Sequence, residues 1–137
     1  SIRAFFPPGT LSDMHASGIG KVLLAHMDSD RRERFIKEMP LEKYTSSTIT
    51  ETEMLISDLN DIQARGFSID NEERNLGMRC IAAPVFDFNR EVIAGISISG
   101  PTSRVGTRSI PVFSDAVLRA ANLLTDAIAG TFPSQKR

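Results

Sequence analysis

The sequence predicts an α+β domain in which helices pack on an antiparallel sheet. Segments with helical periodicity are gathered between residues 17 and 66, whereas segments with a period of two follow one another between residues 67 and 99, before a closing helix. Runs of helices followed by runs of strands are typical of this class, and a doubly wound parallel sheet would need regular alternation. The chain has 137 residues, 41% of them hydrophobic and 24% charged, which indicates one globular domain.

The first element is expected to be a strand over residues 2–6, which the prolines and glycine at 7–9 end. A helix then begins after Ser17, a residue type that favours the N-cap position. It runs through the small residues 18–20 into the helix-forming residues 21–25.

A second helix is expected over residues 30–38, before Pro40. Its predicted buried side chains are Phe35, Ile36 and Met39.

The third helix carries the strongest signals. Thr50 and Glu53 have the spacing of a capping box, and Ile49 and Met54 have that of a hydrophobic staple. Gly66 stands where a C-terminal cap belongs. The predicted apolar face consists of Leu55, Leu59 and Ile62.

Three strands follow, over residues 67–70, 78–86 and 91–99, and the last two are joined by a hairpin turn at 87–90. The closing helix begins near Ser109, has Pro111 in its first turn and ends at Gly130. We expect residues 131–137 to fray. The predicted buried face of this helix consists of Val117, Ala120, Leu124 and Ile128.

Charge and cysteine content exclude several function classes. Sixteen basic and seventeen acidic residues nearly cancel, and the basic run at 31–34 is interrupted by acids, so a solvated helix face explains it better than a nucleic-acid contact. One cysteine excludes an internal disulfide, and with two histidines it gives no zinc-ligand spacing, so we expect no metal and no cofactor. No apolar run is long enough for a membrane span, and no signal peptide is visible, so a cytoplasmic location is expected.

Small polar side chains alternate along the last two predicted strands. Ser97 and Ser99 share one face, as do Met78, Cys80 and Ala82. Hydroxyls, a thiol and a thioether on one surface of an otherwise apolar sheet suit a pocket for a small polar ligand better than a dry core.

The segment 18–20 opens a helix and exposes amides that have no intrahelical partner, which favours an anion. Its glycines could instead serve only close packing against the sheet. Asp70 could accept a hydrogen bond from a ligand hydroxyl, or belong to a solvated acidic turn. Cys80 could act as a nucleophile with His15 as base, but a lone buried cysteine more often behaves as a small apolar side chain.

Several of these segments together resemble the effector-binding domain of IclR-type bacterial transcriptional regulators. The resemblance runs in order from about residue 2 to residue 130. It rests on residues 14–25, 48–50, 66–73, 77–87 and 96–101, which include Gly77-Met78-Arg79-Cys80 and Ile96-Ser97-Ile98-Ser99-Gly100.

The resemblance implies a GAF-like fold, a small organic acid as effector and assembly into homodimers or homotetramers. It places the effector contacts on the backbone amides of Gly18 and Ile19 and on the side chains of Asp70, Cys80, Ser97 and Ser99. Met14 and Met78 would form an apolar wall. Asp13 departs from the family, which often has proline there.

The resemblance further implies a domain over residues 1–130 without its first elements, and a winged helix-turn-helix domain, absent from this chain, that binds DNA. The leading hypothesis is therefore the sensing domain of a repressor that binds an oxo- or hydroxy-acid and transmits this to DNA through the oligomer, and no catalysis is expected. A small cysteine-dependent enzyme acting on a carboxylic acid and a non-binding interaction domain are the alternatives.

Overall fold

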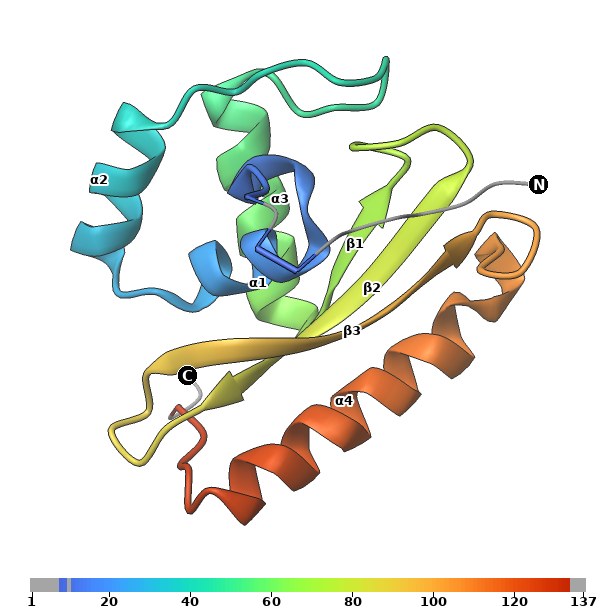
Figure 1. Cartoon of the computed structure of the whole chain (residues 1–137). Coiled ribbons are helices and arrows are strands. Elements are labelled where there is room, and N and C mark those ends of the chain that lie inside the picture. The colour runs from blue at the N-terminus through green and yellow to red at the C-terminus, as the bar shows by residue number, and fades with distance from the viewer. Residues whose placement is uncertain (1–7, 10, 134–137) are drawn as a thin grey trace.

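The computed structural model describes residues 8–9 and 11–133; the strand expected over residues 2–6 and the last part of the expected tail, 134–137, lie outside them. The described residues form four α-helices, two short 3-10 helices and one sheet, which confirms the α+β class (Figure 1). The elements are η1 (Met14–Ala16), α1 (Gly18–His26), α2 (Ser29–Glu38), α3 (Thr52–Arg65), β1 (Ser68–Asn71), β2 (Met78–Phe86), β3 (Val92–Pro101), η2 (Thr107–Ser109) and α4 (Ile110–Ala127).

The sheet has the order β1-β2-β3, and both neighbouring pairs are antiparallel. The hairpin predicted between β2 and β3 is present. Asp87 N donates to Glu91 O at 2.9 Å, and Arg90 adopts a left-handed conformation with φ 65°. The strands predicted from residues 78 and 91 therefore lie side by side, as the alternation of their side chains requires.

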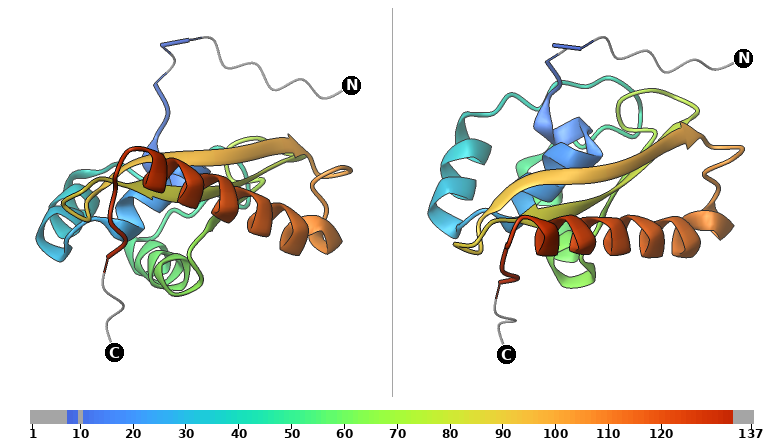
Figure 2. Two further views of the ribbon diagram at one scale, coloured as in Figure 1. Left: turned by 90° about the horizontal axis from the view of Figure 1, so that it is seen from below. Right: turned by 60° about the horizontal axis from the view of Figure 1, so that its bottom comes forward.

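Helices cover both faces of the sheet. α1 packs on one face with α3 beside it, and α4 lies along the opposite face (Figures 1 and 2). The alternation along β2 explains two separate cores: Ala82 belongs to the core shared with α1 and α3, whereas Ile81, Ala83 and Val85 belong to the core under α4. No helix in the described part of the chain is long and apolar enough to cross a membrane.

Local signals set the ends of two helices as predicted. The Ser17 hydroxyl accepts from Gly20 N at 3.1 Å at the start of α1. Gly66 ends α3 with a left-handed φ of 92° and donates its N–H to Ile62 O at 2.8 Å. The predicted apolar face of α3 is fully buried.

The predicted capping box and hydrophobic staple of α3 are wrong. The helix begins one residue later, so that Glu51 occupies the N-cap position and no side chain caps the helix. Ile49 packs against the core of α1 and α3, whereas Met54 is 58% exposed. Ile49 therefore contacts this core and not Met54, so the staple does not form.

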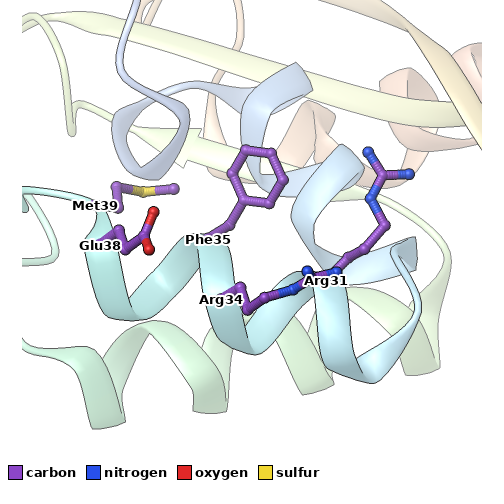
Figure 3. Close-up of a pocket in the computed structure, with 5 residues that line it drawn as sticks. All are labelled: Arg31, Arg34, Phe35, Glu38 and Met39. Atoms are coloured by element: carbon purple, nitrogen blue, oxygen red, sulfur yellow. The ribbon is translucent and has the colours of Figure 1, made fainter.

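The prediction that Phe35 is buried is also wrong, since its side chain is 41% exposed. Phe35 and Met39 project from the same side of α2 (Figure 3). Consecutive helical residues are about 100° apart, so Phe35 and Ile36 project in different directions from α2. Ile36 occupies the buried position.

The predicted and observed buried faces of α4 agree at Val117. After Val117, the buried positions lie one residue later in the sequence than predicted. Ala121 and Thr125 are buried, whereas Leu124 and Ile128 are exposed. The Thr125 hydroxyl accepts from Phe86 N at 3.2 Å. A small residue and a hydroxyl on the buried face let the helix come close to β2, which hydrophobicity alone does not predict.

Candidate functional site

The polar face predicted from the strands is present and is set by the register of the sheet. Cys80 pairs with Asp70 on one side and with Ser99 on the other, so these three residues form a row across all three strands. Ala82 in the next row pairs with Ser68 and Ser97. Rows of this kind place side chains about 5 Å apart on one surface.

The first turn of α1 lies directly over this face. A Cβ added at Gly18 would lie 3.0 Å from Cys80 Sγ and 3.5 Å from Ala82 Cβ, so the absence of a side chain allows the close approach. Ser68 in turn donates its hydroxyl to Gly18 O at 2.6 Å. The glycine therefore serves the close packing considered above, and this packing also brings the helix start to the polar face.

The same turn leaves two backbone donors for a ligand. Lys21 N makes the first intrahelical hydrogen bond, to Ser17 O at 2.9 Å, and Gly20 N is taken by the Ser17 hydroxyl. The backbone N–H groups of Gly18 and Ile19 come before these two residues, so no carbonyl of the helix accepts from them. They lie at the positive end of the helix dipole.

Between the helix start and the sheet face lies a cavity of about 290 Å³. Seven of the eight predicted contact residues line it, together with further residues from the loops around it. The lining residues are Gly9, Ser12, Ala16, Ser17, Gly18, Ile19, Asp70, Arg74, Asn75, Met78, Arg79, Cys80, Ser97 and Ser99.

Met14, which was predicted for the apolar wall, is not among the residues that line this cavity. Met14 packs instead against the core of α1 and α3, and a Cβ at Gly20 would lie 2.5 Å from Met14 Cα and O. Met78 and Ile19 supply the apolar lining.

Asp70 combines a half-buried carboxyl with several hydrogen-bond donors. Burial raises the pKa of Asp70 from 3.8 to about 6. Backbone hydrogen bonds from Glu73 and Arg74 and the charge of Lys21 lower this pKa, while the nearby Glu73 carboxylate raises it. Asp70 Oδ1 accepts from Glu73 N at 2.8 Å, which orders the turn after β1. A solvated acidic turn does not describe this residue.

The Cys80 thiol has no environment that would make it a nucleophile. Burial raises the pKa of Cys80 above its ordinary 9.0, and the negative charge of Asp70 adds to this. Hydrogen bonds from Ser99 and Ser97 and the charge of Lys21 lower the pKa but do not reverse the shift. At neutral pH the site therefore presents a protonated thiol.

A buried ion cluster beneath the site was not predicted. Lys21 Nζ lies 2.8 Å from Asp58 Oδ2, 2.8 Å from Glu73 Oε1 and 2.7 Å from Ile69 O, and its side chain is 1% exposed. Glu73 Oε2 also accepts from Asn71 N at 2.9 Å. This cluster ties α1 and α3 to β1, which carries Asp70, and to the turn after it. A signal was available: Lys21 stands alone in an otherwise apolar helix segment, and a buried charge needs a partner.

Another surface groove, of about 600 Å³, lies against α2, and its polar side chains come from a single element. Its lining residues, Arg31, Arg34, Phe35, Glu38 and Met39, all come from α2 and the residue after it (Figure 3). The cavity under α1 instead gathers polar groups from a helix, three strands and two loops, and is the better candidate for a ligand site.

Comparison with known proteins decides the family. The sequence profile of the bacterial transcriptional regulator IclR C-terminal domain matches residues 1–125. The chain belongs to the IclR family. The curated relatives that it matches are transcriptional regulators and not enzymes.

Two curated relatives of the IclR family show how much of such a protein the chain represents. The HTH-type transcriptional regulator BhcR of Paracoccus denitrificans is 54% identical over 129 residues, which cover 94% of this chain and 46% of that protein. The transcriptional repressor IclR of Escherichia coli is 40% identical over 129 residues, 94% of this chain and 47% of the repressor. The chain thus spans about half the length of these relatives.

Solved structures of IclR-family proteins have the same fold. The Thermotoga maritima IclR structure superposes with a TM-score of 0.89 at 30% identity, over 93% of this chain and 52% of that one. The inducer-binding domain of PobR from Acinetobacter, a double mutant in complex with 3-hydroxybenzoic acid, superposes with a TM-score of 0.74 at 29% identity, over 82% of this chain and 65% of that one.

Proposed function

We propose that this chain is the effector-sensing domain of an IclR-family transcriptional repressor and that its effector is a small organic acid of the oxo- or hydroxy-acid class. The observation that carries the proposal is the convergence, in one cavity, of two free helix amides with the hydroxyls of Ser97 and Ser99, the thiol of Cys80 and the carboxyl of Asp70. We assign the sensing domain to residues 1–130.

Each group has a role in this binding mode. The amides of Gly18 and Ile19 donate to the carboxylate of the effector, and the positive end of α1 favours its charge. Ser97 and Ser99 donate to the remaining oxygens, and Asp70 accepts from a ligand hydroxyl. Each amide–dipole interaction contributes roughly 0.3–1 kcal/mol, or about 2 when partly buried, so the amides orient the acid and the other groups hold it.

The expected affinity follows from ligand size. An acid of about 6 heavy atoms has a ceiling near −9 kcal/mol, and the cost of ordering reduces this to dissociation constants in the micromolar to millimolar range. Such weak binding suits a sensor that responds to changing concentrations of a metabolite.

The relatives support the functional class. One solved relative is named as an inducer-binding domain with an aromatic hydroxy-acid bound, and one curated relative is named a transcriptional repressor. We propose that a winged helix-turn-helix domain outside this chain contacts DNA, that homodimers or homotetramers transmit the signal, and that the protein acts in the cytoplasm.

Calorimetric titration of this chain with two- to seven-carbon oxo-, hydroxy- and aromatic acids tests the proposal. A ligand found this way should bind Ser97→Ala and Ser99→Ala about 5- to 150-fold more weakly, because each change removes a hydrogen bond to the ligand. Ser57→Ala, an exposed serine on α3, is the matched control and should bind like the parent. Unchanged affinity in both site variants would place the ligand elsewhere, and the absence of any binding acid would count against sensing.

A further inference from the structure

Arg74 contributes a cation to the cavity that nothing in the described residues neutralises. Three charged side chains line the cavity: Asp70, Arg74 and Arg79. Each nitrogen of the Arg79 guanidinium already donates one hydrogen bond, to Asn71 Oδ1 at 2.7 and 3.0 Å and to Val105 O at 2.5 Å. Within the described part of the chain, the side chain of Arg74 has no hydrogen bond and no ion pair.

The contact that Arg74 does make leaves its donors available. Its guanidinium carbon lies 3.7 Å from the centroid of the Tyr44 ring. A guanidinium that stacks on an aromatic ring uses its face, whereas its five N–H donors lie in the plane and point outward. The stack therefore holds the group in place while the edge that recognises carboxylates stays free.

The platform under Arg74 is itself held firmly. The Tyr44 hydroxyl donates to Asp13 Oδ2, and its ring stacks on His15 with centroids 6.1 Å apart. Thr45 Oγ1 donates to Glu72 O and Thr48 Oγ1 donates to Glu73 O, each at 2.6 Å. These bonds join the segment that carries Tyr44 to the turn that carries Arg74, so the two side chains keep their relative position.

We propose that Arg74 is a second anchor of the cavity and that the effector is a dicarboxylic oxo- or hydroxy-acid, whose second carboxylate pairs with this guanidinium. The inference rests on the function proposed above and names the ligand more closely. One carboxylate occupies the amides of Gly18 and Ile19, and the other reaches the mouth of the cavity at Arg74.

The volume of the cavity agrees with a longer acid. At about 30 Å³ for each water molecule, 290 Å³ has room for roughly ten waters, and covalently bonded heavy atoms take less room than separate waters. A six-atom monocarboxylate leaves part of that space, including the Arg74 end, to water. A four- or five-carbon dicarboxylate has nine or ten heavy atoms, so it also fits and occupies more of that space.

Matched pairs of acids test this inference by calorimetry on the 137-residue chain. Lactate and malate form one pair, 2-oxobutyrate and 2-oxoglutarate the other, and the members of each pair differ by one carboxylate. The parent should bind the dicarboxylate of at least one pair about 10- to 100-fold more tightly, the range of a charge-assisted hydrogen bond. In Arg74→Met this preference should fall below about twofold, and monocarboxylate affinity should stay within about threefold.

Two further variants keep the test decisive. Arg34→Met, an arginine of α2 that does not line this cavity, should leave the preference unchanged. Arg74→Lys keeps the positive charge and loses the planar edge of the guanidinium, so it should keep part of the preference for dicarboxylates. If Arg74→Met does not fold, Arg74→Lys provides the test.

The outcomes separate the two proposals. Monocarboxylates that bind as tightly as dicarboxylates, or a preference that survives Arg74→Met, would overturn the inference and leave the sensing function standing. A chain that binds none of these four acids and no other dicarboxylate, but binds another monocarboxylate, would also overturn the inference alone. A chain that binds no small acid at all would overturn both.

Discussion

Replacing Asp70 by asparagine should make the domain more stable at neutral pH. Burial raises the pKa of Asp70 from 3.8 to about 6, so at pH 7 the folded protein holds an ionised carboxylate in an environment that favours the neutral acid. The shift is about 2 pKa units, and at about 1.4 kcal/mol per unit the ionised form costs roughly 3 kcal/mol of folding free energy. Asparagine is neutral and keeps an oxygen that can accept from Glu73 N.

The sign of the pH dependence follows from the direction of the shift. Because the folded-state pKa of Asp70 lies above the unfolded one, the folded parent binds more protons between pH 3.8 and about 6. Stability is therefore greatest below the unfolded pKa and is lost as pH rises through the folded pKa. Asp70→Asn has no such titration, so the difference between variant and parent should be small at pH 4 and reach about 1–3 kcal/mol above pH 7.

Urea denaturation followed by circular dichroism at pH 4, 5, 6 and 7.5 measures this difference. Asp61→Asn, an exposed carboxylate on α3, is the control, and its difference from the parent should not change in this way. An Asp70→Asn variant that is less stable than the parent at pH 7.5, or whose advantage does not grow with pH, would refute the electrostatic reasoning.

Two more substitutions examine the thiol and the ion cluster. Cys80→Ser keeps size and hydrogen bonding, so effector affinity measured by calorimetry should stay within about tenfold of the parent; a covalent effector adduct on Cys80 seen by mass spectrometry would favour the enzyme alternative instead. Lys21→Met leaves Glu73 buried without its cation and should cost about 3–5 kcal/mol of unfolding free energy in urea denaturation. A loss below about 1 kcal/mol would show that the cluster contributes little.

The parts of the fold that depend on local sequence were predicted correctly. Ser17 and Gly66 act through their own backbone neighbourhood, and the period of two places Cys80, Ser97 and Ser99 on one face without knowledge of the rest of the chain. The register across strands then brings Asp70 into the same row. The five predicted contacts on the strands line one cavity for this reason, and the packing of α1 adds Gly18 and Ile19, although the binding of an effector there remains a prediction.

The errors arise where long-range packing competes with local preference. Ile49 packs on the core of α1 and α3, so the start of α3 moves by one residue and its capping box is lost. Thr125 is buried because its hydroxyl meets a backbone N–H of β2, a partner 39 residues away. Lys21 finds its two carboxylates 37 and 52 residues away. No window of local sequence contains such pairs.

The contact of Gly20 with the backbone of Met14 has a consequence for engineering ligand specificity. Any β-carbon at position 20 would come within 2.5 Å of main-chain atoms, which cannot rotate away, and one at position 18 would meet Cys80 Sγ at 3.0 Å. Mutational libraries that vary positions 18 and 20 should therefore return mostly misfolded proteins. The strand side is built from side chains, at positions 97 and 99, and new specificities should be selected there.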